Sequence, residues 1–352
     1  MSETNHRIDW VDMARGYGIL LVIIGHLAYE TQFARWIYSF HMPLFFFLSG
    51  FVFVAKGNFI EFLKKKSKAI LVPYFGLGMC IIVFEIIYYP LRGDYHFSFS
   101  KVFYKIKDLL IQKRAWALWF LACLFLLEII FYIIVKVFKN IWFIGIVCLA
   151  MSIGGYHYYQ NDGVGLVWNI DVCLIAIIFF YIGYLSKYLS ERYVNKVLQN
   201  PTRLIVGAVL IILLVAGNIA LARASYASCG RNVDLYFGSL GNPLFSFPSA
   251  IFGILAVIVL SKLHIFESIR YFGEHSLVYY ALHQSIMIPL SESFLQFLGF
   301  ESPDLRNGEY WLYFIAQFFI LIVALTVCCV VLNKTKLGVL IGNYGKIHEK
   351  SH

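Results

Sequence analysis

The sequence predicts an all-α integral membrane protein, a polytopic bundle of about ten transmembrane helices. Three observations predict this class. Of the 352 residues, 60% are hydrophobic and only 14% are charged, and the mean hydropathy is +0.74, far from the composition of a soluble domain. Apolar runs of about twenty residues, long enough to cross ~30 Å of hydrocarbon, recur along the whole chain. These runs are continuously apolar, without the period of two that is typical of membrane β-strands.

The expected helices occupy most of the chain and leave no room for a separate soluble domain. We therefore expect one membrane-embedded domain over residues 1–352. The longest connection, residues 91–114, has apolar residues at helical spacing among lysines, which predicts a helix lying in the membrane interface. The expected transmembrane helices are residues 13–31, 36–55, 69–90, 115–135, 140–158, 168–187, 203–222, 241–262, 274–298 and 310–333.

The basic residues predict the orientation of the chain. With the N-terminus in the cytoplasm, nineteen of the 29 Lys and Arg residues fall inside and ten outside, and six of those ten lie in residues 91–114. We therefore expect both termini in the cytoplasm of a multi-pass protein of the cell (inner or plasma) membrane. The net charge of +9 follows from this orientation and from contact with anionic lipids, so no nucleic-acid partner is expected.

The ends of the chain and the cysteines add two expectations. The first apolar run follows the polar start MSETNHRIDW and shows no small-residue cleavage pattern, so we expect no cleavable signal peptide. The seven cysteines are scattered without paired spacing, so we expect neither a metal site nor a disulfide framework.

The first expected helix carries polar side chains that the bilayer penalises. In the stretch DMARGYGILLVIIGH, Arg15 and His26 are eleven residues apart, so both point from one helix face, with a rise of roughly 16 Å between them. Asp12 stands three residues before Arg15 and can pair with it. This arrangement predicts Arg15 at the cytoplasmic mouth and His26 near mid-membrane. The competing interpretation is an interfacial arginine and a buried histidine bonded to a backbone carbonyl.

The second expected helix adds another histidine. His41 in the run SFHMPLFFFLSGFVF lies about as far beyond the short connection at residues 32–35 as His26 lies before it, so the two histidines of an antiparallel hairpin can share one buried site. We expect Pro43 to bend this helix and the Ser49–Gly50 pair to allow a close helix approach.

A lysine cluster follows on the side expected to be cytoplasmic, in the stretch FLKKKSKAILVPY. Such clusters are usually solvated anchors. This one lies on the same side as Arg15, where Lys65 and Lys68 could hold the phosphates of an anionic cosubstrate.

Together these motifs resemble the membrane acyltransferase family 3, and more closely its polysaccharide O-acetyltransferases of the fucose 4-O-acetylase type. The resemblance spans the ten-helix length. It rests on Arg15 and His26 preceded by Asp12, on FHMPLFFFLSG, on a basic pair before Pro-Tyr, on LWFL at residues 118–121, and on FGEHSLVYYALH. One departure is that the family's cytoplasmic motif commonly has two arginines three residues apart. Here Lys65 and Lys68 occupy those places and offer only point charges to a phosphate.

The resemblance implies transfer of an acyl group, most often acetyl, from cytoplasmic acyl-CoA to a hydroxyl of an envelope glycan or lipid-linked saccharide. Arg15, Lys65 and Lys68 would bind the phosphates of acetyl-CoA or another acyl-CoA. Asp12 would orient Arg15. His26 would take the proton from the sugar hydroxyl or carry the acyl group itself, and both roles stay open. Weaker candidates for supporting or acceptor contacts are His41, Ser49, Trp119 and His283. For Ser49 and Trp119, simple packing is the stronger alternative.

The acceptor side of such a site is harder to assign. Several polar residues near the expected outer helix ends could contact a sugar, and none stands out from the sequence. They are Glu85, Asn169, Asp171, Asn242 and Glu292.

Two other classes of protein fit parts of the pattern. A secondary transporter or flippase of a lipid-linked or acylated sugar also places polar groups in mid-bilayer, although the two halves of the chain show no corresponding broken helices. A structural subunit of an envelope-polymer assembly would need no titratable site. Release of free CoA from acyl-CoA would distinguish an enzyme from both.

Overall fold

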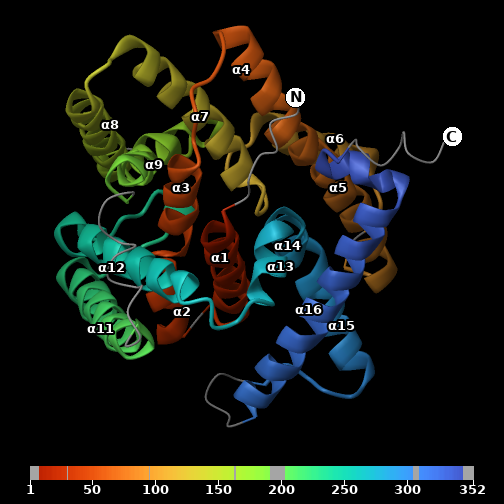
Figure 1. Ribbon diagram of the computed structural model, residues 1–352. Helices are drawn as coiled ribbons and strands as arrows, with labels where there is room; N and C mark the ends of the chain where they lie inside the picture. The colour runs from red at the N-terminus through yellow and green to blue at the C-terminus, as the bar shows by residue number, and fades with distance from the viewer. Residues whose placement is uncertain are drawn as a thin grey trace, which may run out of the picture. The chain divides into compact units, whose positions relative to one another are not determined.

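A computed structural model confirms the all-α class (Figure 1). It describes residues 8–29, 31–94, 96–161, 164–190, 203–303 and 309–343. Within these ranges, eight helices are long and apolar enough to cross a membrane, so the protein is a multi-pass membrane protein. These candidate spans are Asp9–Leu27, Phe59–Arg92, Trp119–Val137, Ile141–Asn161, Val167–Leu189, Arg203–Cys229, Pro243–Lys262 and Tyr310–Lys334.

The two remaining expected helices are each divided into shorter pieces. The segment expected at residues 36–55 consists of α2 (Gln32–Tyr38) and α3 (His41–Phe51). The segment expected at 274–298 consists of α14 (Ser276–Leu282), a π-helical turn (His283–Met287) and α15 (Ile288–Phe297).

Prolines explain where these helices are interrupted. A helix continuing from α2 would bring the ring of Pro43 against the carbonyl of Ser39, four residues earlier. The chain instead breaks at Phe40 (φ −143°, ψ −18°), and Pro43 falls in the first turn of α3, where proline is tolerated. The expected bend at Pro43 is therefore a complete break just before it. Both π-helical turns in the described residues, Ser67–Leu71 and His283–Met287, also stand directly before a helix with proline in its first turn.

The described helices fall into two compact units, each with its own internal contacts. The first unit comprises described residues within 8–54, 138–161 and 175–276. In it, α11 and α12 lie side by side, and α1 packs against α12 and α13 (Figure 1). The helices of this unit are α1 (Asp9–Leu27), α2, α3, α8 (Ile141–Asn161), most of α9 (Ile170–Ser190), α11 (Arg203–Cys229), α12 (Pro243–Lys262) and α13 (Ile269–Glu274).

Glycines allow α3 and α9 of the first unit to pack backbone to backbone. A Cβ atom at Gly50 would overlap the carbonyl oxygen of Phe180, and one at Gly183 would overlap the carbonyl oxygen of Phe47. This confirms the close approach that the Ser49–Gly50 pair predicted.

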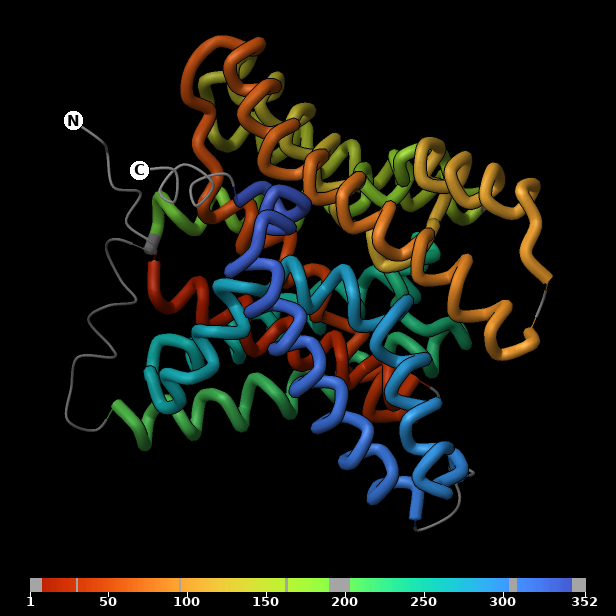
Figure 2. Tube along the Cα trace, turned by 90° about the vertical axis from the view of Figure 1, so that its right-hand side faces the viewer, coloured from red at the N-terminus to blue at the C-terminus, as the bar shows by residue number. Residues whose placement is uncertain are grey.

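The second unit comprises described residues within 55–137, 162–174 and 277–343. Its longest element is a helical rod of 34 residues, Phe59–Arg92 (Figure 2). A capping box of Asn58 and Glu61 starts the rod, and Gly93, with φ +81°, ends it. The unit's elements are α4 (Phe59–Lys66), the turn Ser67–Leu71, α5 (Val72–Arg92), α6 (Phe99–Ile111), α7 (Trp119–Val137), α14, α15 and α16 (Tyr310–Lys334).

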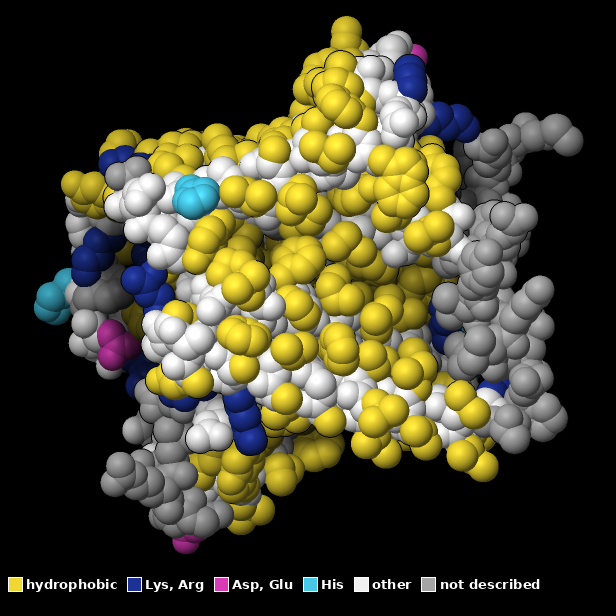
Figure 3. Space-filling model, turned by 90° about the vertical axis from the view of Figure 1, so that its left-hand side faces the viewer, with side chains coloured by type: hydrophobic (Ala, Val, Ile, Leu, Met, Phe, Trp, Pro, Cys, Tyr) yellow, Lys and Arg dark blue, Asp and Glu magenta, His cyan; other side chains and the backbone are white. Residues whose placement is uncertain are grey.

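The sequence prediction of a helix within residues 91–114 is confirmed by α6. Of its large apolar side chains, Leu109 is buried while Phe99, Phe103 and Leu110 are exposed. Large exposed apolar side chains also line the long helices, among them Trp142 of α8 and Ile205 of α11. Hydrophobic side chains cover most of the face in Figure 3, as expected of helices whose solvent is lipid.

Candidate functional site

The polar face of α1 begins with the expected pair of Asp12 and Arg15. The Arg15 Nη1 atom donates to Asp12 Oδ1 at 3.2 Å, one helical turn away. The Asp12 side chain is 3% exposed and that of Arg15 is 31% exposed. The carboxylate is therefore enclosed by protein, while the guanidinium that it orients still reaches the surface, as a ligand for an anion must.

The FGEH motif covers this pair with closely packed backbone. A Cβ atom at Gly273 of α13 would overlap the carbonyl oxygen of Asp12, and one at Gly16 of α1 would overlap the carbonyl oxygen of Ile269. Arg270, also on α13, bonds Asp9 at 3.0 Å. The glycine of this motif thus allows α13 to lie directly against the turn of α1 that carries Asp12 and Arg15.

His26 lies at the other end of α1, where a second group of polar side chains meets. Its Nδ1 atom is 3.2 Å from the hydroxyl oxygen of Tyr38, and the two rings meet edge to face with centroids 5.9 Å apart. The ring of His41 lies on Tyr38 as well, at a centroid distance of 4.7 Å. The two histidines expected to share a site therefore both contact one tyrosine.

Gly25 explains why Tyr38 can reach His26. A Cβ atom at Gly25 would come within 3.2 Å of the Tyr38 ring and 3.3 Å of the Ile37 side chain. A larger residue there would push α2 away from α1. The sequence argument missed Tyr38. The hairpin reasoning that places His26 opposite His41 would place His26 opposite Tyr38 if the connection between the two helices ended a few residues earlier.

The structure corrects the expected end of the first helix. The sequence argument extended the first helix to residue 31 and placed His26 near mid-membrane. In the structure α1 ends at Leu27, so His26 lies in the last turn. His26 is only partly buried.

His41 has a defined hydrogen-bonding state. Its Nδ1 atom lies 2.9 Å from the carbonyl oxygen of Ile37, and because a carbonyl only accepts, Nδ1 carries a hydrogen. His41 is 3% exposed. Ser49 is half-buried on α3, beside the Gly50 contact already described.

The lysine cluster serves two different purposes in the second unit. Lys66 donates to Oε1 of Glu128 on α7 at 2.9 Å, so it joins two helices. Lys65 and Lys68 are exposed. Lys68 also lines a pocket of about 540 Å³ whose other walls are mainly apolar side chains of α5 and of residues 339–340. The predicted phosphate ligands Lys65 and Lys68 are thus accessible, as is Lys64.

Trp119 and His283 also belong to the second unit, and the structure brings their motifs together. The Tyr280 hydroxyl donates to the carbonyl of Ala117, and Tyr280 meets Phe120 edge to face at 5.5 Å. His283 is fully buried, with Nδ1 2.7 Å from the carbonyl of Tyr280. The LWFL and YYALH motifs therefore form one packed contact. Trp119 is also buried, with 5% of it exposed.

Most of the outer polar residues are already occupied by the protein. Glu85 pairs with Lys105 and accepts from the Trp116 indole. Asp171 pairs with Arg114 at 2.6 Å. Asn169 donates to the carbonyl of Trp119, and Asn242 caps α12. The contacts of these four residues hold the fold together. Glu292 differs, because it lines a pocket together with Arg92 and Tyr313.

Comparison with known proteins identifies the chain at the level of a family. A family model described as an acyltransferase domain matches residues 8–333. No curated protein and no solved structure matches the chain significantly. The matched region contains all the candidate residues on α1, α2 and α3, together with the LWFL and YYALH motifs. The chain belongs to the acyltransferase 3 family and is a membrane acyltransferase.

Proposed function

We propose that this acyltransferase moves an acetyl group from acetyl-CoA on the cytoplasmic side to a hydroxyl of an exported or envelope glycan, as a fucose 4-O-acetylase-like enzyme does. The observation that carries the proposal is the pair of polar groups at opposite ends of α1. The Asp12–Arg15 pair presents an oriented cation at one end, and the group of His26, Tyr38 and His41 presents a titratable nitrogen at the other. The rise between Arg15 and His26 is roughly 16 Å.

This separation suits a donor whose charged and reactive ends are far apart. Arg15 binds phosphate at the entrance, and the fixed carboxylate of Asp12 keeps its guanidinium in one orientation. Lys65 and Lys68 are proposed as further phosphate ligands on the basis of the sequence motif. The thioester then lies toward His26.

His26 is the proposed reacting group, with two roles still open. As a general base, its Nε2 atom accepts the proton of the sugar hydroxyl while the oxygen attacks the thioester carbonyl, and the imidazolium returns the proton to the departing sulfur. In that case Nδ1–H must donate to the Tyr38 oxygen, which leaves the Nε2 lone pair facing the substrate. As a nucleophile, the same nitrogen attacks the thioester carbonyl and displaces the CoA thiolate; the sugar hydroxyl then displaces the imidazole from the acyl group, and its proton passes to the released nitrogen.

The test is acyl-CoA turnover by the purified full-length protein. With labelled acetyl-CoA and an extract of envelope glycans, the wild type should release CoA and label the glycan. His26→Ala should lose transfer by about 10²-fold or more while still binding acetyl-CoA. His157→Ala is the matched control, because His157 is an exposed histidine on α8 of the same unit. Wild-type protein that releases no CoA would contradict the proposal and favour the transporter alternative.

A further inference from the structure

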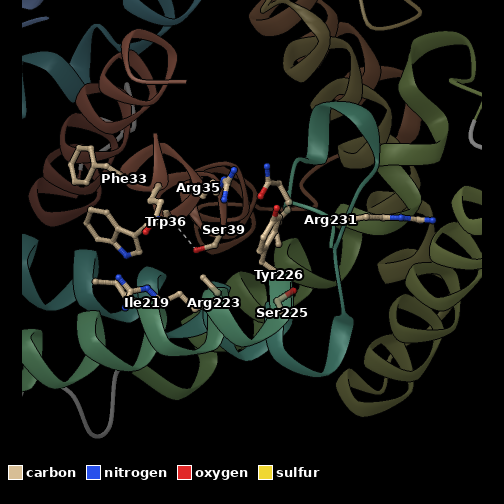
Figure 4. A pocket seen from close by; sticks show the side chains of 13 residues that line it. Phe33, Arg35, Trp36, Ser39, Ile219, Arg223, Ser225, Tyr226 and Arg231 are labelled. Carbon is tan, nitrogen blue, oxygen red and sulfur yellow. Dashed lines mark hydrogen bonds between the residues drawn. The ribbon is translucent and has the colours of Figure 1, made fainter. Parts of the chain in front are cut away.

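The first unit contains a second polar site, separate from the histidines, in a pocket of about 470 Å³. α2 forms one side of the pocket, and the C-terminal half of α11 with the following loop forms the other (Figure 4). The volume falls within the range typical of small-molecule sites. By the orientation expected from the basic residues, this end of α11 lies on the outer side of the membrane, where an exported acceptor would be.

Positive charge distinguishes this pocket. Its lining includes Arg35, Arg223 and Arg231, and no Asp or Glu. The carboxylate that follows in the lining loop, Asp234, accepts from the backbone N–H of Tyr236 at 2.9 Å. In the described part of the chain, none of these three arginines takes part in an ion pair with a carboxylate. Unneutralised arginines in a concave site attract an anion and can hold it with two parallel hydrogen bonds.

The three arginines contribute differently. Arg35 lies over the ring of Tyr226, with Cζ 4.7 Å from the ring centroid, so its orientation is held by a cation–π contact between α2 and α11. Arg231 extends away from the pocket toward α8 (Figure 4), where it donates to Gln160 at 3.1 Å. Arg223 is exposed on α11 and has no hydrogen bond with any described residue. Arg35 and Arg223 are therefore the best placed to receive an anionic group.

The rest of the lining fits the body of a sugar. Phe33, Trp36 and Tyr226 offer aromatic rings against which the apolar face of a pyranose can pack. Gln32 and Asn232 supply side-chain amides, which both donate to and accept from hydroxyl groups. The headgroup of phosphatidylglycerol offers the anion but no ring for the aromatic side chains.

The same helix connects this pocket with the candidate reacting group. Tyr38, the last residue of α2, contacts His26 through its hydroxyl, and the next residue, Ser39, lines the pocket. Asn218 fixes that position by donating to Ser39 Oγ at 3.1 Å and to Ser249 Oγ at 2.8 Å. A ligand held in the pocket is therefore held against the element that orients His26.

We infer that this pocket binds the acceptor through an acidic sugar, a saccharide unit that bears a carboxylate or phosphate. The inference rests on the proposed function, because it names the class of acceptor for that reaction. Arg35 and Arg223 bind the oxyanion, and the aromatic rings pack against the sugar.

Binding of defined oligosaccharides tests this inference without turnover. The full-length protein in neutral detergent is titrated with trigalacturonic acid and, as the uncharged comparison, maltotriose. We expect the acid to bind more tightly. Arg223→Gln and Arg35→Gln should each weaken binding of the acid about tenfold or more, the effect of losing a hydrogen bond between charged groups, and leave maltotriose binding unchanged. Arg203→Gln, at the opposite end of α11 and also exposed, should behave like the wild type.

Three results would overturn the inference. They are equal affinity for the acid and for maltotriose, equal affinity of the Arg223→Gln and Arg203→Gln variants for the acid, and displacement of the acid by phosphatidylglycerol vesicles but not by phosphatidylcholine vesicles. The last would assign the site to a lipid headgroup. An unchanged melting temperature shows that a variant is folded. Failure of the proposed function looks different, because then the wild type would release no CoA with any acceptor, whether or not the acid binds.

Discussion

Replacing Tyr38 by phenylalanine isolates the contact that orients His26. The substitution removes one hydroxyl and keeps the ring, which still meets His41 at 4.7 Å and Tyr29 at 5.7 Å. The hydrogen bond to His26 is 3.2 Å long, at the upper end of the normal range, so we take the lower half of the usual net value, about 0.5–1 kcal/mol. If that energy is used to hold His26 in its reactive orientation, kcat falls about two- to fivefold.

The assay is steady-state transfer from labelled acetyl-CoA, with kcat and the KM for acetyl-CoA measured separately. Since Tyr38 contacts His26, at the opposite end of α1 from Arg15, we expect kcat to fall and the KM for the donor to stay the same. Tyr29→Phe is the matched control, because it removes a neighbouring hydroxyl that has no described bond to His26. The reasoning is refuted if the two variants have the same kcat, or if Tyr38→Phe changes only the KM for acetyl-CoA.

Three further predictions concern the elements around the site. Gly273→Ala should lower the free energy of unfolding by about 1–3 kcal/mol, because the new methyl group overpacks against the Asp12 carbonyl. Gly154→Ala is the control and should have no such effect, because a Cβ atom there meets nothing within 4 Å. Equal melting temperatures of the two variants would contradict this prediction. Lys66→Met should destabilise the protein by up to about 3 kcal/mol, because it leaves the buried Glu128 without its partner. Adding Glu128→Leu should restore much of the lost stability. An unchanged stability of the Lys66→Met variant would show that the pair contributes nothing. Lys65→Ala combined with Lys68→Ala should raise the KM for acetyl-CoA with little change in kcat at saturation, since distant phosphate contacts contribute uniform binding, and an unchanged KM would make these lysines solvated anchors only.

The helical class and the local polar pairs could be predicted from the sequence, because both depend on short-range periodicity. In lipid, every backbone N–H and C=O group of a run of twenty apolar residues needs a hydrogen-bond partner within the same segment, and only a helix provides it. The Asp12–Arg15 bond is equally local, since residues three apart face each other on any α-helix. The amphipathic pattern of α6 likewise required no knowledge of its neighbours.

The tertiary structure decided the features that join distant parts of one unit. The backbone clash that Pro43 would impose divides the second expected helix, and Tyr38, just before that break, contacts His26. Lys66 and Glu128 are 62 residues apart, and Ser39 and Asn218 are 179 apart, so no periodicity relates them. The arginine-lined pocket arises only where α2 meets α11. Such contacts depend on how helices pack side by side, and that packing is set by the shapes of many side chains at once rather than by the spacing of residues along one helix.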